Sequence, residues 1–217
     1  MKKILTISAL VLFSAFAYAQ KPEAVDLGLS VKWASFNVDA TAPEEPGGYY
    51  SWGEVETKTD YRYTTYKWSK GNDHSYTKYC TDPDFGFEGF SDGKKQLDPE
   101  DDVAAVKWGD GWRMPTSKEL FELRSKCKWE YAKSNGMEGY RVTGRNGNSI
   151  FLPMGGTMSS SQPRKEPNWL GKGATYNTST LSEKNPMGAQ GIFLYSGSAS
   201  RQDLRRAGGR MVRPVHE

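Results

Sequence analysis

The first twenty residues constrain the fold most, because they predict that the rest of the chain folds after export. Lys2 and Lys3 precede an uncharged, apolar stretch from Ile4 to Phe16. Ala17-Tyr18-Ala19 then supplies the pattern of small residues at which a signal peptidase cleaves. We therefore expect residues 1–19 to be a signal peptide. The mature chain is then exported, and the sequence leaves open whether it is periplasmic, at the cell surface or secreted.

The length of the apolar stretch argues against membrane attachment. It is shorter than the roughly 20 apolar residues that span a bilayer as a helix, and no later segment comes close. A lipid anchor would need a cysteine at the cleavage point, whereas the first cysteine is Cys80. We therefore expect no membrane insertion of the mature chain.

The mature chain has the size of one domain and almost no net charge. Residues 20–217 amount to 198 residues, which suits a single domain. The whole chain has 29 Lys and Arg against 26 Asp and Glu, and the signal peptide removes two lysines, so the mature excess is +1. This balance gives no basis for binding nucleic acid or an anionic membrane.

Two cysteines, Cys80 and Cys127, are present in the exported chain. An oxidising compartment permits one disulfide between them, and two buried thiols are the alternative. One pair of cysteines cannot complete a tetrahedral zinc site, so these residues predict no structural metal.

Strand-like patterns occur near both ends and in the middle of the chain. Val25–Ala34 alternates apolar and polar residues, which is the period of a strand. Tyr140–Thr143 and Ser149–Leu152 are rich in β-prone residues, and Asn146-Gly147 between them predicts a hairpin. Two further runs predict closing strands: Gly191–Ser196 and Arg210–Val215.

The first predicted helix opens with an acidic cap. Asp98 can cap it, and Pro99 fits its first turn because the missing N–H is not needed there. Its apolar face is then formed by Val103, Ala104 and Val106.

The second predicted helix has a capping box. Thr116 and Glu119 have the spacing at which each side chain reaches the other residue's backbone N–H. Leu120, Leu123 and Cys127 recur at helical spacing behind them. Cys127 should therefore face inward near the end of this helix.

Two stretches predict irregular structure. The aromatic residues between Tyr49 and Cys80 keep no helical period, so we expect loops and short strands with the rings packed over the core. Thr157–Thr180 is rich in Ser, Gly, Thr, Pro and Asn and predicts long surface loops. The order of these elements describes an α+β domain.

Five blocks occur in order along the mature chain: Val25–Ala34 (VDLGLSVKWA), Tyr50–Glu54 (YSWGE), Trp112–Thr116 (WRMPT), Gly147–Pro153 (GNSIFLP) and Val212–Val215 (VRPV). Together they resemble a family of exported Bacteroidetes proteins related to the Fibrobacter succinogenes major paralogous domain. The resemblance covers nearly all of residues 20–217. It implies a C-type-lectin-like fold, in the variant shared with formylglycine-generating sulfatase-modifying factors. Such a fold has two helices, short twisted antiparallel sheets and long loops.

Arg113-Met114-Pro115-Thr116 stands where that superfamily has an Arg-Leu-Pro-Thr motif before a helix. Pro115 forces an extended approach, Thr116 caps the helix, and Arg113 can reach carboxylates or carbonyls, so we interpret the motif as structural. The sulfatase-modifying enzymes of this superfamily share a close pair of catalytic cysteines late in the chain. No cysteine follows Cys127 here, so the resemblance does not imply that chemistry.

Patterns for catalysis are weak. Histidine occurs only as His74 and His216, which leaves little material for a nucleophile and base pair. Asp82–Gly93 begins like a calcium loop, but Gly86 and Gly93 stand at its fifth and twelfth positions, where oxygen ligands are required. We therefore expect no enzyme and no required cofactor.

Glu166-Pro167-Asn168 copies the tripeptide with which mannose-type C-type lectins bind calcium and sugar. Two oxygen-bearing side chains around a proline suit a calcium ion. The partner Trp-Asn-Asp triplet is absent downstream. Calcium binding here is thus an alternative to a plain polar loop.

Aromatic, amide and charged side chains late in the chain suit sugar recognition. A flat ring packs against the apolar face of a pyranose, while polar groups bind the hydroxyls. The predicted ligand contacts are Glu166, Asn168, Trp169, Tyr176, Asn177, Tyr195, Arg201 and Arg205. Core packing is the alternative for the aromatic residues. A solvated face is the alternative for the arginine cluster Arg201, Arg205, Arg206 and Arg210.

The sequence therefore favours an exported, non-enzymatic binding module. It would contact a glycan or a surface protein through the loops between Thr157 and Arg206. Two alternatives stay open. One is a structural or tip subunit of a surface or pilus assembly, and the other is a polysaccharide-active enzyme, which would need two carboxylates in a cleft.

Overall fold

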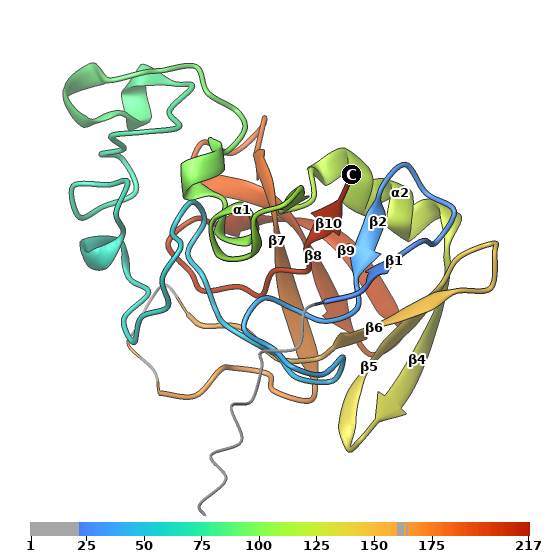
Figure 1. Cartoon of the computed structure of the whole chain (residues 1–217). Helices are drawn as coiled ribbons and strands as arrows, with labels where there is room; N and C mark the ends of the chain where they lie inside the picture. The colour runs from blue at the N-terminus through green and yellow to red at the C-terminus, as the bar shows by residue number, and fades with distance from the viewer. Residues whose placement is uncertain (1–21, 160–162, 164) are drawn as a thin grey trace, which may run out of the picture.

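The computed structural model describes residues 22–159, 163 and 165–217. Within these residues the chain forms three small antiparallel sheets and two α-helices, joined by long loops and short 3₁₀ turns (Figure 1). The mixed architecture with short antiparallel sheets is as predicted, although strand exceeds helix. The predicted signal peptide lies outside the described residues. No helix within the described residues is long and apolar enough to cross a membrane.

The first sheet joins the two ends of the described chain. Its strands, in spatial order, are β1 (Ala24–Val25), β2 (Lys32–Ala34), β10 (Val215–His216) and β3 (Trp112–Arg113). The prediction of one strand over Val25–Ala34 is wrong, because the chain turns back and Val25 pairs with Trp33. Gly28 lies in that turn with a φ of +71°, a conformation that glycine adopts without strain.

The second sheet contains the predicted hairpin. Its strands are β4 (Lys128–Ser134), β5 (Met137–Thr143) and β6 (Ser149–Pro153). Thr143 pairs with Ser149 across the loop that holds Asn146-Gly147, which confirms this prediction. Strand β4 was not predicted, although Trp129 and Tyr131 alternate with charged residues along it.

The third sheet begins within the stretch for which the sequence predicted surface loops. Its strands are β7 (Gly173–Leu181), β8 (Gly188–Tyr195) and β9 (Ser198–Arg205). The prediction of long loops over Thr157–Thr180 is wrong for β7, whose residues are almost all buried. Small and polar residues form this strand because neighbouring segments bond to its backbone; Asn177, for example, donates its N–H to the Met211 carbonyl at 3.0 Å. The strand predicted over Gly191–Ser196 is confirmed within β8.

The segment before β10 is not the regular strand that was predicted over Arg210–Val215. Only Val215 of that run belongs to a strand, β10. Arg210 and Met211 instead form single bridges, to Tyr50 and Tyr176 respectively. The chain therefore runs through the interior and bonds to several elements in turn.

Helix α1 (Val103–Trp108) begins later than predicted. Asp102 caps it, because its carboxylate accepts the N–H groups of Ala104 and Ala105 at 2.9 and 3.1 Å. Asp98 has no side-chain capping bond, and Pro99 opens a 3₁₀ turn, Pro99–Asp101. Val106, predicted on the apolar face, is half exposed.

Helix α2 (Ser117–Lys126) begins with the predicted capping box of Thr116 and Glu119. Leu120 and Leu123 are buried, and Cys127 packs against the same core at the end of the helix. This core lies between α2, the second sheet and the third sheet.

The aromatic segment between Tyr49 and Cys80 packs as predicted, through loops and a 3₁₀ turn, Tyr63–Thr65. Tyr63, Tyr66 and Tyr76 form a core of their own together with Cys80. This part of the chain, coloured cyan to green, lies to one side of the sheets (Figure 1).

Of the two alternatives for the cysteines, the structure shows the free thiols: Cys80 and Cys127 are not bonded to each other. Cys80 belongs to the tyrosine cluster and donates to the Asp82 carbonyl at 3.1 Å. Cys127 packs against the main core instead. The two thiols are thus held in different clusters, and burial raises the pKa of each.

Candidate functional site

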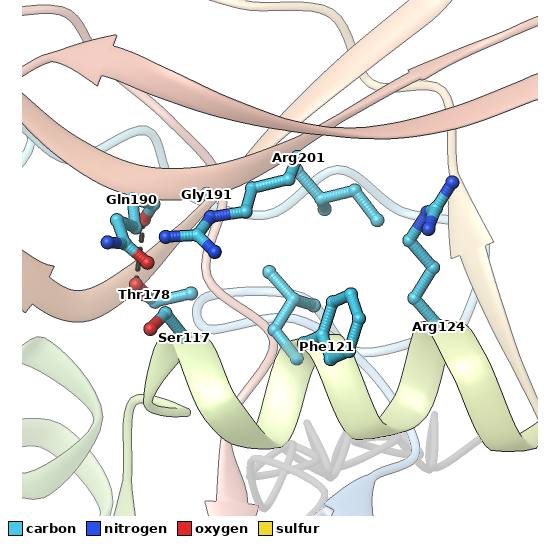
Figure 2. Close-up of a pocket in the computed structure, with 9 residues that line it drawn as sticks. Ser117, Phe121, Arg124, Thr178, Gln190, Gly191 and Arg201 are labelled. Atoms are coloured by element: carbon cyan, nitrogen blue, oxygen red, sulfur yellow. Dashed lines mark hydrogen bonds between the residues drawn. The ribbon is translucent and has the colours of Figure 1, made fainter. Parts of the chain in front are cut away.

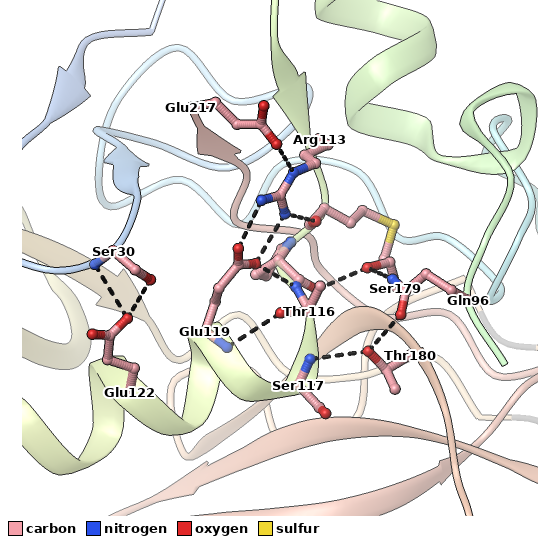
Figure 3. Close-up of polar contacts among 12 residues, drawn as sticks. Ser30, Gln96, Arg113, Thr116, Ser117, Glu119, Glu122, Ser179, Thr180 and Glu217 are labelled. Atoms are coloured by element: carbon pink, nitrogen blue, oxygen red, sulfur yellow. Dashed lines mark hydrogen bonds and ion pairs between the residues drawn. The ribbon is translucent and has the colours of Figure 1, made fainter.

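The Arg113–Thr116 motif fixes the start of α2 (Figure 3). Arg113 donates to both carboxylate oxygens of Glu119, at 2.9 and 2.7 Å, and through Nε to Glu217 at 3.2 Å. Glu119 also accepts the Thr116 N–H at 2.7 Å. Burial by itself would raise the pKa of Glu119, but the contacts with Arg113 and Thr116 hold it below its ordinary value. These contacts support a structural role for the motif.

Hydrogen bonds from an irregular stretch of β7 connect α2 to the third sheet. Ser179 donates its N–H and its hydroxyl to the Pro115 carbonyl, at 2.9 and 3.2 Å. The Ser117 N–H donates to the Thr180 hydroxyl at 3.0 Å, as Figure 3 shows. The first turn of α2 is therefore rigidly placed over one face of the sheet.

Three aromatic rings meet on the opposite face of the third sheet, and we call them the aromatic platform (Trp169, Phe193 and Tyr195). Phe193 and Tyr195 alternate along β8 with Ile192, which faces the core. Their rings are nearly parallel, at 13°, with centroids 6.4 Å apart. Trp169 stands across both, with centroids at 6.1 and 5.9 Å and interplanar angles of 78° and 70°. The rings thus form an angular surface.

Neighbouring backbone holds the platform in place. Gly173 lies beneath it, and a Cβ there would stand 3.5 Å from Trp169 and Phe193 and 3.0 Å from the Leu194 carbonyl. Trp169 itself has a φ of +66°, a conformation that non-glycine residues seldom adopt. The Tyr140 hydroxyl donates to the Tyr195 carbonyl at 2.6 Å, which fixes the end of β8.

A row of polar side chains borders the platform on β9. Ser198 pairs with Tyr195 and Ser200 with Phe193, so both serines share the face of the rings. Gln202 continues the row and donates to the Ser200 hydroxyl at 3.3 Å. Rings beside hydroxyl and amide groups have the chemistry to contact a sugar.

Two of the predicted ligand contacts lie in the interior. Tyr176 is 2% exposed and Asn177 is 3% exposed. The Tyr176 hydroxyl donates to the Pro153 carbonyl at 2.9 Å, and burial raises the pKa of Tyr176 to about 12. The Asn177 amide donates to the Tyr50 carbonyl at 3.3 Å. Both side chains therefore support the core and do not reach the platform.

The Glu166-Pro167-Asn168 tripeptide leads into the platform. Glu166 is exposed, whereas Asn168 is half-buried and pairs through its backbone with Thr157, at 2.8 and 2.9 Å. This pairing sets the position of Trp169, the next residue.

An acidic group in another part of the molecule has the spacing of metal ligands. Among the described residues, Asp98, Glu100 and Asp101 form such a group. Lys78 lies 2.7 Å from Asp98 and 2.6 Å from Asp101, and Lys94 lies 2.6 Å from Asp98. Hydrogen bonds with these two lysines lower the pKa of Asp98 to about 2. A cation would have to displace the ammonium groups, so the cluster serves as an ion-pair network.

The prediction of a surface cluster of four arginines is wrong for two of them. Arg206 and Arg210 are buried, whereas Arg201 and Arg205 are exposed. Arg206 lies over the Tyr76 ring, with Cζ 3.3 Å from the centroid. The buried guanidinium groups donate to backbone carbonyls of irregular segments. A carbonyl buried away from water needs a hydrogen-bond donor, and these arginines supply it.

A groove on the α2 side of the third sheet is the second candidate site (Figure 2). Arg201 reaches across it toward Gln190 and Thr178, and Phe121 lies between Arg201 and Arg124 (Figure 2). Beyond Gln190 and Arg201 the groove opens into a trough of about 580 Å³. We call this the Gln190 trough, and its lining residues are Ser182, Glu183, Lys184, Gln190, Arg201, Gln202 and Asp203.

Sequence reasoning missed Phe193 and Gln190. The alternation along the predicted strand Gly191–Ser196 could have placed Phe193 beside Tyr195, because residues two apart in a strand share a face. Gln190 has no such signal, since its burial depends on the packing of β8 against other elements.

Comparisons with protein-family models, curated proteins and solved structures find no match to this chain.

Proposed function

We propose that this protein is an exported, non-enzymatic carbohydrate-binding module that holds a sugar on the aromatic platform. The observation that carries this proposal is the pair Trp169 and Tyr195. These rings come from a loop and a strand, lie 5.9 Å apart, and are 52% and 45% exposed. Leu170, the residue after Trp169, is 47% exposed. Large exposed rings that lie together favour an interaction site.

The chemistry of the platform favours a neutral glycan. The rings offer flat faces for the C–H groups of a pyranose, while Ser198, Ser200 and Gln202 offer donors and acceptors for its hydroxyls. All of these side chains are uncharged. A glycan chain can run along β9 and contact rings and polar row together.

We extend the proposal to the fold, which we assign to the C-type-lectin-like class. The first sheet joins the chain ends, and α2 follows the Arg113–Thr116 motif with a capping box, as the resemblance implies. The N-terminal signal peptide pattern supports export to the periplasm, the cell surface or the medium.

Binding to immobilised neutral polysaccharides tests the proposal, with the mature protein in affinity electrophoresis or calorimetry. Each aromatic contact contributes about 0.5–1.5 kcal/mol, so Trp169→Ala and Tyr195→Ala should each weaken binding about 3- to 10-fold. Tyr131→Ala is the matched control, because Tyr131 is 46% exposed on β4 and outside the platform. The proposal fails if the wild-type chain retains no glycan, or if Trp169→Ala binds as well as Tyr131→Ala.

A further inference from the structure

We propose a second ligand site, in the Gln190 trough, for a sugar acid: a small ligand that carries a carboxylate beside hydroxyl groups. Gln190, Arg201 and Asp203 line the trough from the α2 side of the third sheet, opposite the aromatic platform, while Gln202 of the polar row also borders it. The inference does not depend on glycan binding at the platform.

The first observation is a buried acceptor without a donor. Gln190 is 3% exposed, and within the described residues its Oε1 has no hydrogen-bond partner. Buried polar atoms are nearly always paired, so this oxygen is free to accept a hydrogen bond from a partner outside the chain. The end of the groove beside Gln190 has room for a water-sized group. A ligand hydroxyl has this size and can donate to Oε1.

The second observation is a set of free charges around the same residue. In the register of β8 and β9, Gln190 pairs with Asp203 and Ile192 pairs with Arg201, so the polar side chains share one face. Within the described residues, neither Arg201 nor Asp203 takes part in an ion pair. Lys184 also lines the trough. The site therefore offers donors for a carboxylate next to acceptors for hydroxyls.

These groups select one class of ligand. A guanidinium binds a carboxylate through two parallel hydrogen bonds, which assigns the acid group to Arg201. Gln190 and Asp203 then accept hydroxyl donors. A neutral sugar would leave Arg201 without an anion, and a sulfate ion would offer Gln190 no donor. The volume of about 580 Å³ is ample for one sugar ring.

The test titrates galacturonate into the mature protein, followed by NMR or calorimetry, with galactose as the neutral comparator. Wild type should bind galacturonate at least tenfold more tightly than galactose. Arg201→Gln and Gln190→Leu should each weaken galacturonate binding at least tenfold. Arg205→Gln removes an exposed arginine of the same strand outside the trough, and it should leave binding unchanged.

Two results would overturn the inference: wild type that binds galacturonate no better than galactose, or Arg201→Gln that binds it like wild type. Gln190→Leu should keep the wild-type Tm, because the Oε1 atom has no partner to lose. If Gln190→Leu does not fold, galacturonate binding by Arg201→Gln still tests the inference, because Arg201 is exposed. Trp169→Ala, which tests the platform, should leave galacturonate binding unchanged, so failures at the two sites are distinguishable.

Discussion

Arg213 joins two segments of the chain, residues 34–37 and strand β6, to its own segment from inside the protein. Its side chain is 2% exposed, and its Nε donates to Asn37 Oδ1 at 2.7 Å. Its terminal nitrogens donate to the carbonyls of Ala34 and Ser35, both at 3.0 Å, and of Phe151 at 2.8 Å. Burial lowers the pKa of Arg213 to about 10, so the group still carries its charge at neutral pH. Replacing it by methionine should therefore leave four acceptors without a donor.

The size of the loss follows from these contacts. A typical intramolecular hydrogen bond contributes about 0.5–1.5 kcal/mol net, so the loss of four costs about 2–6 kcal/mol. Methionine also removes the desolvation penalty of the buried charge, which offsets part of this cost. The net loss in free energy of unfolding for Arg213→Met is then roughly 3–5 kcal/mol. Domains of this kind are stable by only about 5–15 kcal/mol. The variant should lose a third or more of its free energy of unfolding.

Urea unfolding followed by tryptophan fluorescence measures the effect. With a slope of about 2 kcal/mol per molar urea, the midpoint of Arg213→Met should fall by about 2 M. Arg205→Met is the control, because Arg205 is exposed and its ion pair with Asp73, at 3.7 Å, lies on the surface. That variant should stay within about 0.5 kcal/mol of wild type. A loss below 1 kcal/mol for Arg213→Met would refute the reasoning, and Arg213→Lys should be intermediate.

Three further outcomes are expected. Thr116→Ala should lower the free energy of unfolding by about 1 kcal/mol through loss of the capping box, and an unchanged urea midpoint would contradict this. The folded-state pKa of Glu119 is lowered, so its contribution is present above its ordinary value of 4.5 and is lost as the pH falls through the folded value. Glu119→Gln should make the acid limb of a plot of Tm against pH less steep, and parallel curves would exclude this role. Alkylation in denaturant should modify both Cys80 and Cys127 without added reductant, whereas modification that needs reductant would show a disulfide; in the native protein the buried Cys80 should react more slowly than Cys127.

Local signals in the sequence were sufficient where the deciding contacts lie within a few residues. The capping box of Thr116 and Glu119 and the hairpin around Asn146-Gly147 are both present, because each depends on atoms close together in the chain. The start of α1 shows the limit of such signals. Asp98 and Asp102 are both suitable caps, but the Asp102 carboxylate also accepts the N–H of Met114 at 2.8 Å. That distant contact selects the cap.

The candidate sites depended on tertiary structure to a greater degree. Trp169 and Tyr195 were predicted one by one, and only the fold brings their rings within 5.9 Å of each other. Tyr176 lies two positions after Ala174 on the core face, and nothing in its composition separates it from an exposed tyrosine. Alternation assigns two faces to a strand, but packing decides which of them is covered.

The sequence by itself determined the signal peptide pattern, the absence of a strong charge bias, the capped second helix and one hairpin, all of which follow from composition or short-range geometry. Only the tertiary structure decided which arginines are buried, that the cysteines stay apart, and where the platform and the trough lie. Arg206 and Arg210 look like Arg201 and Arg205 in the sequence. The first two are buried because carbonyls from distant irregular segments need donors there, and such partners are chosen by the fold as a whole.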